Sequence, residues 1–263
     1  MGNKHLIVVD VDGSIGKKYH PDIFVKKVLE MDPEEFWDIV VKTEQQFPQS
    51  SDVYVTFPGM LLHLYQKKFG QNPRRGLFLE VGQELNQDYF YPGAETFFPE
   101  LKADHPERDF YCGPVTQGIV PMIEGSRFGK TIDFIRGYDF VTEDGSRDGL
   151  ITMVGQNCSN VNKGALIHTL SQGDGVSNKS HQWPFEDAFY VIDGDTDKSI
   201  AHVAKDSCGI IIVEHTTDQE ALTERVRYAE GLRDKGYGTV ISLNDFRRGG
   251  PVRDIIDKRI RTL

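Results

Sequence analysis

The chain has 263 residues, enough to bury a substantial core as one large domain or as a domain carrying a sizeable insertion. Its 38% hydrophobic and 27% charged residues are typical of a globular protein and indicate neither a disordered nor a membrane-embedded class. The formal net charge of −10 at pH 7 repels other polyanions at long range, which argues against nucleic acid and anionic membranes as partners.

No stretch reaches the roughly 18 consecutive apolar residues of a membrane span. The apolar run near the N-terminus is short and interrupted by acids, unlike a signal peptide, so we expect a cytoplasmic protein. The three cysteines, Cys112, Cys158 and Cys208, lie far apart, which predicts neither a disulfide framework nor a zinc cluster. Cys112 and Cys208 stand beside strand-like runs and are predicted as small buried apolar residues.

The first predicted element is segment 6–9, LIVV, which runs directly into the acids Asp10 and Asp12. Aliphatic residues without alternation are typical of a strand that is covered on both faces of a parallel sheet. Ligands of such sheets bind beyond the carboxyl ends of the strands, where both acids would lie. Because neighbouring carboxylates repel each other and are costly to bury, we predict a site that pairs them with a cation or uses them chemically.

Two other interpretations of these acids follow from the residue types. Asp12 and Gly13 form a common turn pair, and either acid could cap a following helix. A calcium loop needs glycine and glutamate later in the pattern, but here Gly13 comes too early and Pro21 stands where the glutamate should be. We favour a site over a turn and set the calcium loop aside.

Helical patterns follow from about residue 21 to residue 68, in segments 22–31, 32–47 and 57–70. Asp32 is predicted to be the N-cap of the second segment, with Pro33 at its first helical position. A simple crossover between parallel strands needs far fewer residues. The block is therefore predicted to be an insertion that could serve as a lid.

Strand-like runs then recur at 109–116, 138–142, 188–195, 209–215 and 238–243. Most of them are separated by helical segments, at 117–126, 163–173 and 218–236, and the basic C-terminal run is predicted as the solvated face of a last helix. This alternation predicts an α/β fold, with a parallel sheet flanked by helices and joined by right-handed crossovers.

Chemically competent residues stand at the ends of three strand-like segments and at the start of helical segment 163–173, and they would converge on one edge of the sheet. They are the acids Asp10 and Asp12, the hydroxyl of Thr116, the cation Lys163, and the acidic cluster Asp193, Asp195 and Asp197. A phosphoryl group is anionic, so attack by a carboxylate requires a metal and further positive or hydrogen-bonding groups. Magnesium prefers oxygen ligands, and an aspartyl phosphate is a known covalent intermediate.

The four segments together resemble the motifs of the haloacid dehalogenase-like superfamily, in its phosphatase branch. DVDGS resembles the first motif, VTQGIVPMIEGS the second, Lys163 the third and DGDTD the fourth. The resemblance implies a Rossmann-like core with a helical cap inserted between the first two motifs. The implied boundaries are 1–16 and 91–263 for the core and 17–90 for the cap.

The resemblance also implies roles for individual residues. Asp10 would attack phosphorus, Asp12 would act as general acid and then general base, and Lys163 would neutralise the phosphoryl group and orient Asp10. Ser14, Thr116, Gln117 and Gly118 would bind the substrate. Magnesium would be held by Asp10, by the backbone carbonyl of Asp12 and by Asp193, with Asp197 in support.

Three departures from the family pattern leave alternatives open. Ile192 stands where glycine usually precedes the fourth motif, so Asp195 could replace Asp193 as the ligand. Lys179, in a polar loop, is a rival of Lys163 for the role of the site lysine. Ser14 replaces a threonine at the loss of a methyl group.

Asp12 favours phosphate ester hydrolysis over dehalogenation, because an alkoxide needs a proton donor and a halide does not.

Two further segments invite functional interpretations. GSRFGKT at 125–131 resembles a phosphate-binding P-loop, but its spacing is one residue short and a helical pattern precedes it, so we reject this reading. The aromatic segment 89–98 could line the substrate entrance or belong to the core.

The leading hypothesis is a magnesium-dependent phosphatase that hydrolyses a small phosphorylated metabolite through a phosphoaspartate. Two alternatives are a noncatalytic binding or regulatory protein with the same fold, and a phosphotransferase that uses an acceptor other than water. No pattern in the sequence selects one substrate or one oligomeric state.

Overall fold

The computed structural model describes residues 4–46, 53–85, 88–155, 158, 163–172, 187–193, 208–213, 219–234 and 238–262. Its centre is a parallel sheet of six strands in the order β3-β2-β1-β6-β7-β8. The strands are β1 (Lys4–Val9), β2 (Asp109–Ile119), β3 (Arg136–Tyr138), β6 (Asp187–Ile192), β7 (Cys208–Val213) and β8 (Gly238–Leu243). The predicted α/β class with a parallel sheet is confirmed.

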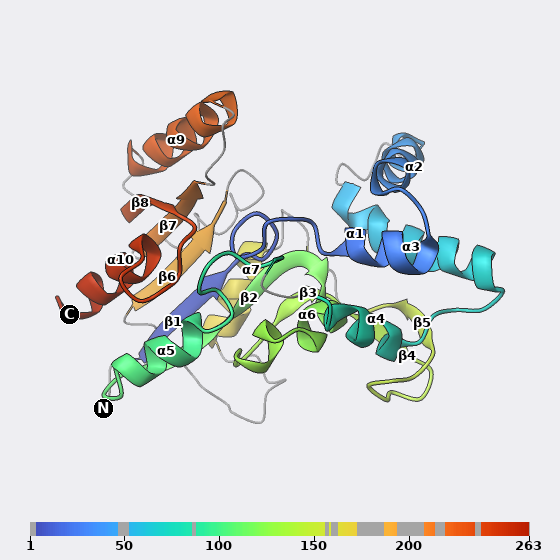
Figure 1. Ribbon diagram of the computed structural model, residues 1–263, viewed down its shortest axis with the longest axis horizontal. Coiled ribbons are helices and arrows are strands. Elements are labelled where there is room, and N and C mark those ends of the chain that lie inside the picture. The colour runs from blue at the N-terminus through green and yellow to red at the C-terminus, as the bar shows by residue number, and fades with distance from the viewer. Residues whose placement is uncertain are drawn as a thin grey trace.

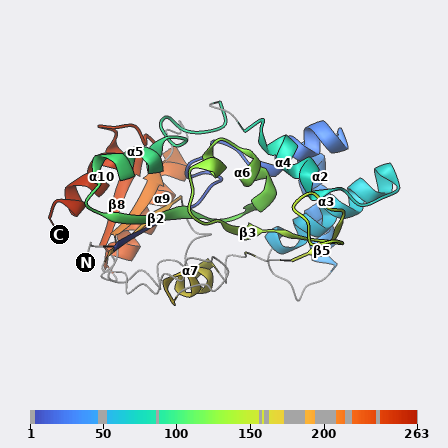
Figure 2. The ribbon, with the colours of Figure 1, turned by 90° about the horizontal axis from the view of Figure 1, so that it is seen from below.

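Strand β1 lies inside the sheet and is covered on both faces. Ile7 and Val9 belong to a core cluster that includes residues of α5 (Phe97–Asp104) and α10 (Pro251–Ile260). Leu6 and Val8 belong to a second cluster with α7 (Lys163–Gln172) and α9 (Gln219–Asp234). Figure 2 shows α5 and α10 on one face of the sheet and α7 on the other. These four residues of β1 are each 0% exposed, which explains why the apolar run 6–9 is unbroken.

The segment between β1 and β2 is largely helical. It contains α1 (Pro21–Phe24), a π-helical turn η1 (Val25–Leu29), α2 (Pro33–Gln45), α3 (Val53–Phe69) and α4 (Arg75–Gly82). Helices α1 to α3 lie to one side of the sheet (Figure 1). The Asp32 cap is confirmed, since its Oδ1 accepts a hydrogen bond from the Glu34 N–H at 2.8 Å. No helix in the described ranges combines the length and the apolar character that a membrane span needs.

Two glycines bring α4 against α6 (Val120–Gly125), the helix that follows β2. A Cβ atom on Gly82 would overlap the carbonyl oxygen of Met122, and one on Gly125 would overlap that of Leu79. The two helices therefore approach backbone to backbone, and this packing joins the end of the helical segment to the sheet domain. A short 3-10 turn, η2 (Phe128–Lys130), follows α6.

The expectation of one parallel-sheet strand over 138–142 is wrong. Only β3 (Arg136–Tyr138) joins the main sheet, whereas β4 (Phe140–Thr142) pairs antiparallel with β5 (Ile151–Val154) in a separate two-stranded sheet. Backbone hydrogen bonds attach this hairpin to the helical segment, from Ile151 N to Pro73 O and from Arg75 N to Gly149 O, each 2.9 Å. These contacts link distant parts of the chain, so the local sequence pattern does not reveal them.

Candidate active site

The register of the sheet brings three predicted site residues to one edge. Val9, the last residue of β1, lies opposite Pro114 of β2 and Val191 of β6. Asp10 follows Val9 directly, and its backbone N–H donates to Val191 O at 2.9 Å. Thr116 and Asp193 are each two residues beyond the paired positions, so both extend past the same carboxyl edge.

A pocket of about 80 Å³ lies at this edge. The predicted site residues that line it, together with Tyr19, are Asp10, Asp12, Thr116, Gln117, Lys163 and Asp193. Ser14 and Gly118 do not line the pocket. Ser14 is wholly buried, and the backbone N–H of Gly118 donates a hydrogen bond to Thr116 Oγ1. Lys179, Asp195 and Asp197 lie outside the described residues.

Lys163 and Asp10 form a buried ion pair in this pocket. The Lys163 Nζ donates to Asp10 Oδ1 at 3.0 Å, and the two side chains are only 1% and 7% exposed. Lys163 is the first residue of α7, so the helix fixes where its side chain enters the pocket. A buried ammonium is stable only beside a counter-charge, and Asp10 supplies it.

Thr116 and Gln117 add neutral donors to the same pocket. The Gly118 N–H donates to Thr116 Oγ1 at 3.0 Å, which leaves the hydroxyl hydrogen able to bond a ligand. Gln117 is 5% exposed, and its amide nitrogen has no hydrogen-bond acceptor among the residues that the structure describes. Buried donors of this kind usually have a partner, so an anion in the pocket would satisfy both.

Asp12 is held by two residues that the sequence analysis did not assign to the site. Its Oδ1 accepts hydrogen bonds from Tyr89 Oη at 2.6 Å and from His20 Nδ1 at 2.9 Å. Tyr89 begins the aromatic segment 89–98, whose Phe97 and Phe98 pack in the core. No local pattern links Tyr89 or His20 to Asp12, because the contacts depend on the fold.

The turn after Asp12 is shaped to receive Asp193. Gly13 has φ +85°, a conformation that side chains disfavour, and a Cβ atom there would overlap Asp193 Oδ2. The carboxylate of Asp193 therefore lies directly against the turn that carries Asp12. Ile192, which departs from the expected glycine, is buried in the second core cluster.

Comparisons with known proteins identify the architecture. No protein-family model and no curated protein matches the sequence. Several solved structures match: a phospho-aspartyl intermediate analogue of phosphoserine phosphatase (16% identity, TM-score 0.53, 97% of this chain and 99% of that chain), a haloacid dehalogenase family hydrolase from Salmonella enterica subsp. enterica serovar Typhi (13%, 0.53, 91% and 68%), and a phosphoserine phosphohydrolase-like protein from Francisella tularensis subsp. tularensis SCHU S4 (16%, 0.51, 85% and 92%). The chain has the haloacid dehalogenase-like fold.

In this haloacid dehalogenase-like fold, the charges of the pocket suit a divalent cation. Among the described lining residues, Asp10, Asp12 and Asp193 share the pocket with one ammonium, that of Lys163, so negative charge is in excess there. Among the described residues, no three His, Cys, Asp or Glu side chains gather closely enough to bind a metal by themselves. The donors that fit are two carboxylates with a backbone carbonyl, a set of hard oxygen ligands that magnesium accepts alongside water or phosphate oxygens.

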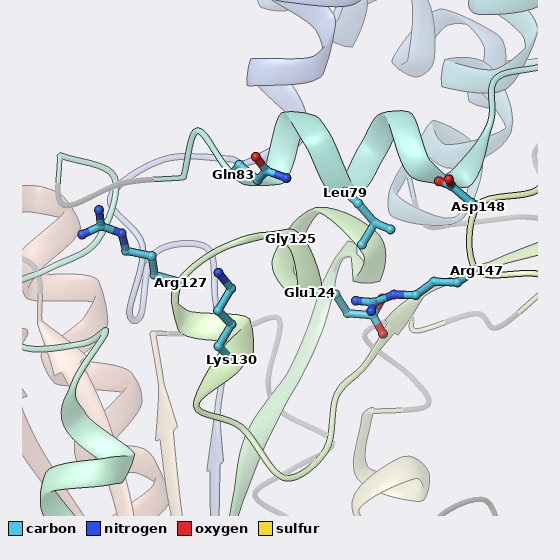
Figure 3. A pocket seen from close by; sticks show the side chains of 8 residues that line it. All are labelled: Leu79, Gln83, Glu124, Gly125, Arg127, Lys130, Arg147 and Asp148. Atoms are coloured by element: carbon cyan, nitrogen blue, oxygen red, sulfur yellow. The ribbon is translucent and has the colours of Figure 1, made fainter.

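A larger cavity, of about 650 Å³, lies elsewhere in the protein, between α4, the end of α6 and the loop before β5 (Figure 3). Its charges are mixed: Arg127, Lys130 and Arg147 share it with Glu124 and Asp148. It includes part of the segment 125–131, which follows helix α6 rather than a strand, as expected. None of the residues that we predicted to be catalytic lines this cavity, whereas Asp10, Asp12 and Lys163 line the smaller pocket.

Proposed function

We propose that this protein is a magnesium-dependent phosphatase that hydrolyses a small phosphomonoester through a phosphoaspartate on Asp10. The observation that carries the proposal is the buried Lys163–Asp10 pair, 3.0 Å long, in one pocket with the donors of Thr116 and Gln117. That combination offers a nucleophile beside an anion-binding surface. A similar solved structure, described as a phospho-aspartyl intermediate analogue of phosphoserine phosphatase, supports the same chemistry.

In the first half-reaction, the Asp10 carboxylate attacks phosphorus and forms an acyl phosphate. The bond between phosphorus and the leaving ester oxygen breaks, and Asp12 gives its proton to that oxygen. Lys163, Thr116 and Gln117 hydrogen-bond the nonbridging oxygens. Because these donors are already in place before the reaction, they need not move when negative charge develops on the phosphoryl oxygens in the transition state.

In the second half-reaction, water attacks the phosphorus of the acyl phosphate. Asp12, now a carboxylate, accepts a proton from that water, and the bond between Asp10 and phosphorus breaks. Inorganic phosphate and the free Asp10 carboxylate result. Asp12 is again protonated, ready for the next ester.

Magnesium would be held by Asp10, Asp193 and the backbone carbonyl of Asp12, with Asp197 in support. When bound, it offsets the negative charge of the pocket and polarises the phosphoryl oxygens. The helices of residues 17–90 would form a cap over a core made of residues 1–16 and 91–263. A cytoplasmic location remains a prediction from the sequence.

The pocket volume of about 80 Å³ favours a small substrate. Asp10, Lys163 and Thr116 line this space, so the reacting phosphoryl group would lie there. The remainder of the substrate would lie towards Tyr19, on the side of the helical segment. A phosphorylated metabolite of modest size meets this requirement.

The direct test measures phosphate release from 4-nitrophenyl phosphate and a panel of phosphorylated metabolites, with magnesium and with EDTA. We expect magnesium-dependent turnover, and we expect Asp10→Asn to lower kcat by about 10³-fold or more because the nucleophile is lost. Asp109→Asn, at the exposed start of β2, is the matched control and should retain activity. Absence of turnover by the parent protein on the whole panel, or an active Asp10→Asn variant, would overturn the proposal.

A further inference from the structure

The two oxygens of the Asp12 carboxylate lie in different environments. Oδ1 accepts three hydrogen bonds, from Tyr89 Oη at 2.6 Å, from His20 Nδ1 at 2.9 Å and from the His20 backbone N–H at 3.0 Å. Within the described part of the chain, no group donates to Oδ2. The side chain is 8% exposed, and Asp12 lines the proposed catalytic pocket.

Tyr89 is a fixed donor to Oδ1. Its side chain is 5% exposed, and a phenol, with an ordinary pKa of about 10, is protonated at neutral pH. The phenol therefore keeps its proton, and the short contact is a hydrogen bond from Tyr89 to Asp12. Hydrogen bonds to a carboxylate are stronger than those between neutral groups.

His20 is fixed in one tautomer. The imidazole is 0% exposed, and its Nε2 accepts a hydrogen bond from the Ile119 backbone N–H at 2.8 Å. An accepting Nε2 carries no proton, so the neutral ring must carry its proton on Nδ1. That proton points to Asp12 Oδ1, and β2 thereby sets the orientation of a carboxylate at the end of β1.

Two glycines make room for this arrangement. A Cβ atom on Gly16 would overlap the ring of Tyr89, and a Cβ atom on Gly118 would overlap the imidazole of His20. Tyr89 and His20 therefore approach the Asp12 turn more closely than other residues at positions 16 and 118 would allow. The two side chains come from opposite ends of the helical segment, and they meet at a single oxygen.

We propose that Tyr89 and His20 are positioning residues that reserve Oδ2 of Asp12 for proton transfer to and from the substrate. With Oδ1 saturated by donors, the proton sits on Oδ2 and passes to the ester oxygen as the bond from phosphorus to that oxygen breaks. The same oxygen accepts the proton of the hydrolytic water in the second half-reaction. This inference rests on the proposed phosphatase function.

The proposal predicts an effect that depends on the leaving group. An alkoxide is a poor leaving group and needs the proton, whereas 4-nitrophenolate leaves well without one. The value of kcat/KM reports the steps up to departure of the leaving group, so it isolates the acid role of Asp12. Loss of either positioning residue should therefore lower kcat/KM more for an alkyl phosphate than for 4-nitrophenyl phosphate.

The experiment compares kcat/KM for glycerol phosphate and 4-nitrophenyl phosphate in the parent protein and in Tyr89→Phe, His20→Asn and Asp12→Asn. We expect the ratio of the alkyl to the aryl value to fall by about tenfold or more in both positioning variants, and further in Asp12→Asn, since general acids contribute about 10² to 10⁴ in rate. Tyr111→Phe, a buried tyrosine of β2 in the second core cluster, is the control and should keep the parent ratio.

Purely structural roles for Tyr89 and His20 would lower both values together. If Tyr89→Phe and His20→Asn leave the ratio unchanged while Asp12→Asn lowers it, the positioning role is wrong and the phosphatase proposal stands. If one positioning variant does not fold, the other still decides. An active Asp10→Asn variant would instead reject the proposed function itself, so the two failures are distinguishable.

Discussion

The ammonium of Lys163 lies 3.0 Å from Oδ1 of Asp10, and the two side chains are 1% and 7% exposed. An exposed ion pair of this kind would contribute little to the free energy of unfolding. In a buried pair, removal of one partner leaves the other charge buried without compensation, which is strongly destabilising. Asp10 is one of three carboxylates that line the pocket, whereas Lys163 is the one ammonium among its described lining residues. The two partners are therefore not equivalent.

This asymmetry predicts unequal effects on stability. Lys163→Met should lower the free energy of unfolding by about 3 kcal/mol or more, because it leaves buried carboxylates without a cation. Asp10→Asn should cost less, since Asp12 and Asp193 still provide negative charge around Lys163. Urea unfolding in EDTA measures both values. A larger loss for Asp10→Asn than for Lys163→Met would contradict this description of the pocket.

The Gly13 turn predicts a specific loss of magnesium binding. Gly13→Ala should raise the magnesium concentration needed for half-maximal activity by about tenfold, because a Cβ atom at this position displaces Asp193. Gly70→Ala is the matched control: Gly70 has φ +73° and thus similar backbone strain, but nothing lies within 4 Å of its added Cβ atom. If both variants show the same magnesium dependence, Asp193 does not take part in metal binding.

Arg75 should stabilise the junction between the helical segment and the sheet domain. It is 7% exposed, and its guanidinium contacts Glu124 at 2.9 Å and Asp139 at 3.0 Å. These carboxylates raise the pKa of Arg75 above its ordinary value, although burial opposes them. Arg75→Met should lower the free energy of unfolding by about 1 to 3 kcal/mol, since the carboxylates are partly exposed and can hydrate.

The neighbouring residue Arg74 is exposed and provides the control for this measurement. Arg74→Met should change the free energy of unfolding by less than about 0.5 kcal/mol. Equal effects at the two positions in urea unfolding would show that the junction does not depend on the Arg75 network.

Cys112 should react slowly with alkylating reagents. Burial raises the pKa of its thiol well above the ordinary value, so little thiolate forms at pH 8. The neutral thiol is therefore the favoured form in the folded protein, and the reactive thiolate forms more readily once unfolding exposes the residue. Iodoacetamide labelling with peptide mass spectrometry should modify Cys112 only in denaturant. Rapid labelling of the native protein at this residue would contradict its buried position on β2.

The sequence predicts the elements whose information is local. The apolar run of β1, the bounds of β8 and the Asp32 cap all follow from residues within a few positions of one another. The convergence of Asp10, Thr116 and Asp193 also follows, because parallel strands end at a common edge. The pairing of Lys163 with Asp10 could be anticipated only from the resemblance, since α7 enters the pocket from a distant part of the chain.

The parts that sequence reasoning misses depend on contacts between distant segments. Residues 140–142 form a hairpin with β5 rather than a strand of the main sheet, and Pro73 and Gly149 fix that hairpin to the helical segment. Helices α4 and α5 also escaped the sequence analysis; α5 carries Pro99 in its first turn, where a proline is tolerated. Tyr89 and His20 likewise meet Asp12 only in the folded protein.

The central claim is that Asp10 becomes phosphorylated during turnover. The most direct measurement mixes the enzyme with magnesium and 4-nitrophenyl phosphate, reduces any acyl phosphate with borohydride, and locates the resulting homoserine by peptide mass spectrometry. We predict homoserine at position 10 in the parent protein and none in Asp10→Asn. Homoserine at Asp12 or Asp193, or turnover that leaves position 10 unmodified, would contradict the account.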